Sequence, residues 1–247
     1  NASERTFRYA YMNSALESGI NNPVDETLRV SNISNPLDAA ILSHDHPNVD
    51  GYRKVAEIPF DFERRLLSVI AGNGNDNLMI TKGAPESVIA RCGAYQLDDE
   101  PRPMDETSLL RCKSIYQSFS EKGFRVLGVA YRRIPAQDSF TVRDERDLTL
   151  LGFVTFLDPP LDEAAEAIQS LHRDGIRIKI MTGDNPLVTR YICEKVGLEV
   201  TRIVLGDEID QIDDVALAHL AEQTVVFARV SPMQKNRVIL GLKAGKH

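Results

Sequence analysis

Polar residues in the second half of the chain stand where strands of a parallel sheet are predicted to end. Asp158 follows the apolar run LTLLGFVTFL, and Thr182-Gly183-Asp184 follows IRIKIM. Ligands of open α/β sheets bind at that edge, and N–H groups where a helix begins can hold an anion. Lys235, after FARVSP, supplies an ammonium that can neutralise a phosphoryl group. Together these residues predict phosphoryl binding, although either Asp alone could simply cap a helix.

A second group of residues surrounds a predicted β-hairpin in the first half. RLLSVIAG and NLMIT are typical of strands, and GNGND between them supplies residues that tolerate positive φ. Phe60 and the pair Arg64-Arg65 precede the first strand, and Lys82-Gly83 follows the second. An aromatic ring, several cations and a glycine on one wall suit a flat base with a charged tail. The hairpin therefore predicts a nucleotide site.

The elements that must position these residues differ between the two halves. Residues 1–150 predict an α+β domain, an antiparallel sheet with flanking helices. Residues 151–247 alternate strands and helices, which predicts an α/β unit with a parallel sheet. In the first domain, helices are expected at 3–18, 85–92 and 106–123, strands at 52–60, 65–72, 77–81 and 124–134, and an irregular loop at 95–105.

Two similar phrases in the first domain, NNPVDETL and SNPLDAAIL, each offer an Asp near a predicted helix start. Local sequence favours a capping role for that Asp in both phrases.

The composition narrows the class of protein. The chain has 247 residues, of which 43% are hydrophobic and 26% charged, as in soluble globular proteins. A net charge of −7 argues against nucleic-acid binding. Three separated cysteines without a CxxC favour reduced thiols in the cytosol. His44 and His46 lie in a polar loop without nearby cysteines, so no metal site is expected.

Four motifs, in order along the chain, resemble those of the P-type ATPases. DPP at 158–160, MTGDN at 181–185 and FARVSPMQK at 227–235 resemble the phosphorylation domain of that family. KGAPE at 82–86 resembles the signature of its nucleotide-binding domain. IPFDFERRLLSV and NPLDAAIL look most like the magnesium-importing P-type ATPases of bacteria, with proton and calcium pumps as an alternative. The resemblance implies a nucleotide-binding domain followed by a partial Rossmann-like unit of the haloacid-dehalogenase type.

The resemblance also implies roles for residues of the first half. Phe60 matches the ring that stacks on adenine, and Asp38 matches the acidic residue that contacts the adenine amino group. Lys82 matches the lysine that lines the base pocket, with Gly83 giving close backbone access. Arg65 matches a basic position near the ATP phosphates.

Further roles are implied nearer the phosphates. Arg125 and Leu127 match the arginine and the apolar residue beside the ribose and phosphates. Asp158 matches an aspartate at the hinge. Thr182, Gly183 and Asp184 match the turn that cradles phosphate, and Lys235 matches the lysine that pairs with the phosphoaspartate.

Departures from the family pattern bear on catalysis. DKTGT, whose Asp is the nucleophile, and GDGxNDxP, which holds Mg²⁺, do not occur in the 247 residues, and Leu161 stands where the family often has a basic residue. Phosphoryl transfer needs a nucleophile and a metal. We therefore expect the chain to bind ATP, with a Kd on the order of 0.1–1 mM, and not to turn it over.

The family resemblance places the chain in a larger protein. It implies the cytoplasmic part of an integral cell-membrane ATPase, bacterial in origin, whose partners are ATP, its own membrane domain and its actuator domain, with Mg²⁺ in the full-length enzyme. Lacking the DKTGT strand, the second half is expected to be incomplete and to self-associate or be less ordered. A soluble haloacid-dehalogenase-type phosphohydrolase with a cap domain and a non-enzymatic nucleotide-sensing module remain alternatives.

Overall fold

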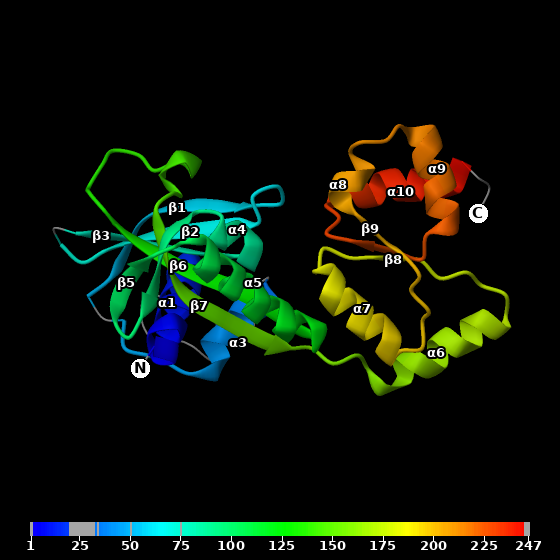
Figure 1. The fold of residues 1–247 in the computed structure, drawn as a ribbon, viewed down its shortest axis with the longest axis horizontal. Coiled ribbons are helices and arrows are strands. Elements are labelled where there is room, and N and C mark those ends of the chain that lie inside the picture. The colour runs from blue at the N-terminus through cyan, green and yellow to red at the C-terminus, as the bar shows by residue number, and fades with distance from the viewer. Residues whose placement is uncertain (1, 20–32, 34, 50, 75, 245–247) are drawn as a thin grey trace. The chain divides into compact units, whose positions relative to one another are not determined.

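The computed structural model describes residues 2–19, 33, 35–49, 51–74 and 76–244 (Figure 1). The chain divides into two compact units. The first contains Asn1–Tyr116 and Val126–Phe156, and the second contains Gln117–Arg125 and Leu157–His247. The phrase NNPVDETL, where a helix start is expected, lies outside the described residues.

A seven-stranded mixed sheet forms the first unit, in the order β1-β2-β3-β6-β7-β4-β5. Neighbours in the series β1, β2, β3 and β6 pair antiparallel, as do β4 and β5, whereas β4 and β7 run parallel. The strands are β1 Arg53–Asp61, β2 Leu66–Gly72, β3 Asn77–Gly83, β4 Cys92–Leu97, β5 Glu100–Pro103, β6 Phe124–Ile134 and β7 Leu148–Leu157.

Helices pack on both faces of this sheet, so β2 and β3 are buried throughout their length. On one face, Leu67, Val69 and Ile80 pack against α1; we call this the α1 face. On the other, Leu66, Ile70 and Met79 pack against α4 and α5; we call this the α4 face. The helices are α1 Ala2–Glu17, α3 Pro36–His44, α4 Pro85–Ile89 and α5 Glu106–Glu121, with a short 3₁₀ turn, η3, at Val142–Asp144.

Two expectations for the first unit are wrong. The stretch 95–105, expected to be an irregular loop, contributes to the β4–β5 hairpin, whose turn residues Asp98 and Asp99 both have positive φ. Asp tolerates that conformation, which matches the twist of a two-residue hairpin. The apolar strand β7, expected to open the α/β unit, instead lies in the first sheet beside β4. The contacts therefore divide the chain after Phe156 rather than near residue 150.

The second unit contains the expected parallel sheet covered by helices. Its three described strands, β8 Ile180–Met181, β9 Ile203–Leu205 and β10 Val226–Ala228, lie in the order β8-β10-β9. The short strand β8 is therefore an edge strand of the described sheet. The helices are α6 Asp162–Arg173, α7 Pro186–Lys195, α8 Gly206–Ile209, α9 Asp214–Gln223 and α10 Pro232–Ala244.

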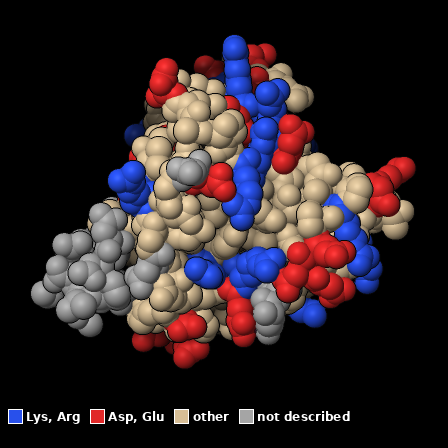
Figure 2. All heavy atoms as spheres, turned by 90° about the vertical axis from the view of Figure 1, so that its left-hand side faces the viewer, with Lys and Arg blue, Asp and Glu red and all other residues tan. Residues whose placement is uncertain are grey.

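The surface carries charges of both signs. Figure 2 shows a row of Lys and Arg side chains crossing one face, with Asp and Glu side chains on either side. No helix among the described residues is long and apolar enough to cross a bilayer. Cys92, Cys112 and Cys193 are free thiols.

Candidate functional sites

Lys82 and Asp38, two of the predicted nucleotide ligands, form an ion pair inside the first unit. Lys82 is the next-to-last residue of β3 and is 5% exposed, and Asp38 lies in the first turn of α3 and is 2% exposed. Local sequence does not show that two residues 44 positions apart pair, but the α1 face brings these two together with Ser14 of α1. The Ser14 hydroxyl donates to Asp38 Oδ1 over 2.6 Å.

Asp38 is free to face Lys82 because another residue caps its helix. The Asn35 side chain accepts a hydrogen bond from the Leu37 N–H (3.1 Å), which satisfies the first turn of α3. Asn35 also donates to Asp38 Oδ2 over 2.6 Å. The capping role that local sequence favours for this Asp is therefore wrong. Both carboxylate oxygens are instead bonded inside the fold.

The Lys82 ammonium uses all three of its donors within the protein. It bonds to the Ser14 hydroxyl (2.9 Å), to Glu17 Oε2 (3.1 Å) and to Asp38. Burial raises the pKa of Glu17, and the negative charge of Asp38 acts in the same direction, whereas Lys82 opposes the shift. We call Ser14, Glu17, Asp38 and Lys82 the Lys82 cluster. Its two carboxylates and one ammonium make it rich in hydrogen-bond acceptors.

Lys82 points to the α1 face, because it pairs with Leu67. Phe60 lies in an irregular part of β1, since the register of pairing with β2 shifts between Ile58 and Asp61. Alternation along the strand therefore does not assign Phe60 to either face. The Phe60 ring is 48% exposed, so it offers a flat apolar surface to solvent.

Leu127 lies on the α1 face of the sheet, like Lys82. Lys82 pairs with Val129 of β6, and Leu127 is two residues away on the same strand. Leu127 packs against the cluster of buried residues that contains Ile41 and Leu42 of α3. The structure thus brings Asp38, Lys82 and Leu127 to one face of the first unit.

Arg65 and Gly83 meet through their backbones. The Arg65 carbonyl accepts a hydrogen bond from the Ala84 N–H (3.0 Å), and a Cβ on Gly83 would lie only 2.1 Å from that carbonyl oxygen. Glycine is therefore required here by the approach of Arg65. Arg65 itself has a φ of 56°, and its guanidinium lies 3.9 Å from the Glu86 carboxylate of the KGAPE motif.

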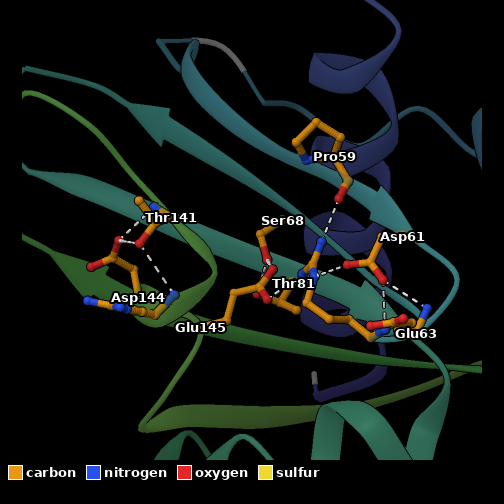
Figure 3. A network of polar contacts seen from close by, with 10 residues as sticks. Pro59, Asp61, Glu63, Ser68, Thr81, Thr141, Asp144 and Glu145 are labelled. Atoms are coloured by element: carbon orange, nitrogen blue, oxygen red, sulfur yellow. Dashed lines mark hydrogen bonds and ion pairs between the residues drawn. The ribbon is translucent and has the colours of Figure 1, made fainter.

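A second buried ionic group, which the sequence did not reveal, occupies the α4 face (Figure 3). Glu145 is fully buried and pairs with Arg64 Nη1, and its other oxygen accepts from the Ser68 hydroxyl (2.7 Å). Ser68 in turn bonds to the Thr81 hydroxyl (2.7 Å), and Arg64 also pairs with Asp61. We call these five residues the Glu145 cluster. Glu145 and Arg64 are 81 positions apart, and no motif marks Glu145.

In the second unit, Asp184 and Thr182 form the predicted turn after β8. The Thr182 hydroxyl donates to Asp184 Oδ2 (3.0 Å) and accepts from the Asp184 N–H (3.1 Å). Asn185, rather than Asp184, caps α7. The Thr182 N–H bonds to the Phe227 carbonyl (3.0 Å), which ties the turn to β10.

Arg125 belongs to the second unit, where it joins the two predicted aspartates. Its guanidinium lies 3.1 Å from Asp158 and 3.2 Å from Asp184. Within the described part of the chain, its Nε is buried without a hydrogen-bond partner. Leu127 is assigned to the first unit. Asp158 does not cap α6, whose cap is Leu161.

Gly183 and Lys235 complete the predicted phosphoryl group. A Cβ on Gly183 would meet nothing closer than the Val230 carbonyl at 3.9 Å, so the turn is open there. Lys235 lies in the first turn of α10, as expected. No group of three or more His, Cys, Asp or Glu side chains that could hold a metal ion occurs among the described residues.

Two protein families match overlapping parts of the chain. The family described as P-type ATPase, cytoplasmic domain N, matches residues 10–163. This chain belongs to the P-type ATPase family. The family of haloacid dehalogenase-like hydrolases matches residues 115–244, which include most of the second unit and support its Rossmann-type fold.

Individual P-type ATPases are similar along most or all of the chain. Magnesium-transporting ATPase, P-type 1, of Escherichia coli K12 is 35% identical over 247 residues, which is 99% of this chain and 27% of that protein. Calcium-transporting ATPase lmo0841 of Listeria monocytogenes is 32% identical over 84% of this chain and 25% of its own length. The chain thus spans about a quarter of these relatives.

Proposed function

We propose that the first unit binds ATP on its α1 face, with adenine stacked on Phe60. The observation that carries this proposal is the gathering of Lys82, Asp38 and Leu127 on one face of a unit that also exposes the Phe60 ring. A half-exposed ring offers stacking area, and Leu127 supplies an apolar contact near the sugar. Arg65 supplies positive charge toward the phosphates.

The Lys82 cluster suits the base better than the phosphates. The adenine amino group is a donor, and the carboxylates of Asp38 and Glu17 are acceptors. Lys82 has its three donors occupied, so it supports the pocket by fixing these carboxylates and through its methylene stem. Gly83 contributes by allowing Arg65 to approach β3.

For the second unit we propose a role in supporting a phosphoryl group. Thr182, Gly183 and Asp184 form an open turn with free space at the glycine. Lys235 provides a cation, and Arg125 balances the charges of Asp158 and Asp184. The described residues supply no carboxylate cage for Mg²⁺, so no step of this proposal involves a bound metal.

The whole protein is proposed to be an ATP-driven cation transporter in which this chain is a cytoplasmic part, working with a membrane domain and an actuator domain. Magnesium is the proposed ion, because relatives named as magnesium transporters match 99% of the chain, against 84% for the calcium-transporting protein of Listeria. The 247-residue chain alone is proposed to bind ATP without turnover, since it contains no DKTGT sequence.

Titration calorimetry with ATP tests the binding site. We expect a Kd on the order of 0.1–1 mM, which Phe60→Ala weakens about tenfold because stacking is lost. Phe62→Ala is the matched control, because Phe62 is also exposed and its ring lies 5.3 Å from that of Phe60. Equal losses in both variants, or no heat with the unmodified chain, would refute the assignment. Steady ATP hydrolysis by the pure chain would refute the proposed inactivity.

Complementation tests the proposed ion. The full-length gene should restore growth at low Mg²⁺ to cells that lack magnesium uptake, and a variant lacking the phosphorylated Asp should not. Calcium transport without magnesium transport would favour the alternative within the same family.

A further inference from the structure

The Glu145 cluster has features that packing alone does not require. Glu145 follows η3 in the loop before β7 and is fully buried, yet it is charged and makes two hydrogen bonds. Its partner Arg64 has a side chain only 12% exposed. Replacing such a pair with apolar residues is often neutral or stabilising. The position of the pair therefore points to a role in holding a particular geometry.

One end of the cluster holds the backbone on both sides of Phe60. Arg64 Nη2 donates to the Pro59 carbonyl over 2.6 Å, and Arg64 Nε pairs with the Asp61 carboxylate. Asp61 Oδ1 also accepts from the N–H groups of Glu63 and Arg64, each over 2.8 Å. Pro59 and Asp61 are the two chain neighbours of Phe60. The guanidinium thus fixes the conformation of the residue that is proposed to stack on adenine.

The other end reaches the strand that carries Lys82. Glu145 bonds to Ser68, and Ser68 bonds to Thr81, the residue before Lys82 on β3. Figure 3 shows Glu145 pointing toward Ser68 and Thr81 between the strands and the loop. One buried carboxylate therefore connects the Phe60 segment with β2 and β3.

We propose that Glu145 is a positioning residue for nucleotide binding. It holds the Arg64 guanidinium so that the residues on both sides of Phe60 keep one conformation and the ring stays in place for the nucleotide. Glu145 itself lies on the α4 face, opposite the face proposed to bind ATP, and does not touch the nucleotide. This inference rests on the proposed ATP site in the first unit.

Arg64→Lys in the 247-residue chain is the first test. Lysine keeps the charge opposite Glu145, but it lacks the planar fork that bonds Glu145, Asp61 and Pro59 together. We expect a folded protein whose Kd for ATP is about tenfold weaker. Glu145→Gln, which removes the charge but keeps the shape of the side chain, should also weaken ATP binding. Asp144→Asn is the matched control, because Asp144 is the neighbouring carboxylate and accepts hydrogen bonds from Thr141.

A combined variant separates positioning from a general loss of structure. If Arg64 acts through Phe60, Arg64→Lys should weaken ATP binding no further in a Phe60→Ala background, as followed by NMR titration. Independent losses in that background would overturn the inference. An unchanged Kd in folded Arg64→Lys and Glu145→Gln would also overturn it.

The same experiment distinguishes the two proposals. If Phe60→Ala leaves ATP binding unchanged, the ATP site itself is wrong. If Phe60→Ala weakens binding while Arg64→Lys and Glu145→Gln do not, the ATP site stands and only the positioning role fails.

Discussion

The Lys82 cluster and the Glu145 cluster are two buried ionic groups on opposite faces of the same pair of strands. Ser68 and Thr81 pair across β2 and β3 and face Glu145, while the next pair, Leu67 and Lys82, faces α1. Each cluster places one cation beside two carboxylates. In the Lys82 cluster every charged side chain except Glu17 is nearly inaccessible, whereas in the Glu145 cluster Glu145 is the only charged side chain that is fully buried.

The difference shows how ionic groups serve a proposed site in two ways. The Lys82 cluster joins helices to a strand and presents acceptors at the face proposed to bind the base. The Glu145 cluster fixes a backbone turn from behind the sheet. Lys82 and Asp38 lie in motifs that resemble those of the family, KGAPE and NPLDAAIL. No such motif contains Glu145.

The largest expected effect comes from breaking the Lys82 cluster. Lys82→Met should lower the free energy of unfolding by about 3–5 kcal/mol, because Asp38 then stays buried without a counter-charge. Urea unfolding followed by circular dichroism measures this loss. Lys54→Met is the control, because Lys54 pairs with Glu57 at the surface and should change stability by about 1 kcal/mol or less. Similar losses for both lysines would mean that burial of the pair carries little energy.

Glu145→Ala should have a smaller effect, about 2–3 kcal/mol. Arg64 would lose its buried partner but keep Asp61 and some access to solvent. The same urea titration compares this variant with Lys82→Met. A loss larger than that of Lys82→Met would reverse the order of the two clusters.

Gly83→Ala tests the backbone contact that lies between the clusters. The added Cβ would approach the Arg65 carbonyl to 2.1 Å, so the turn or β3 must shift, at a cost of about 1–3 kcal/mol. Gly175→Ala provides a comparison in which no atom lies within 4 Å and only the positive φ is strained. Chemical shift changes confined to Arg65 and its neighbours would support this interpretation, and an unchanged spectrum would contradict it.

The smallest expected effect is a dependence of folding stability on pH, which arises from Glu17 in the Lys82 cluster. Burial raises the pKa of Glu17 in the folded state, so the folded protein binds more protons than the unfolded chain between the two pKa values. Stability should therefore fall as the pH rises through that interval. Glu17→Gln should remove this part of the decline, so that its stability relative to the unmodified chain is greater at pH 7 than at pH 4. Thermal unfolding of both proteins at pH 4 and pH 7 measures this change in relative stability. A relative stability that is greater at pH 4 than at pH 7 would rule out the raised pKa of Glu17.

Local patterns predicted much of the fold for identifiable reasons. The helix that became α5 has an apolar stripe and a terminal glycine, and α7 begins where Asn185 and Pro186 stand. The β2–β3 hairpin carries its own turn signal. The β4–β5 hairpin was missed because its turn consists of two Asp residues rather than Asn-Gly or Asp-Gly. The position of β7 depends on pairing with the distant strand β4, which no local pattern shows.

The sequence by itself determined the family, the order of its motifs and the residues proposed to bind nucleotide, because motif chemistry depends on residues close together in the chain. Tertiary structure alone decided which charges meet. Lys82 meets Asp38 and Glu17, Arg64 meets Glu145, and Arg125 meets Asp158 and Asp184. The buried members of these pairs, Lys82, Asp38 and Glu145, need partners because burying an unpaired charge is costly, and the fold determines which partners lie within reach.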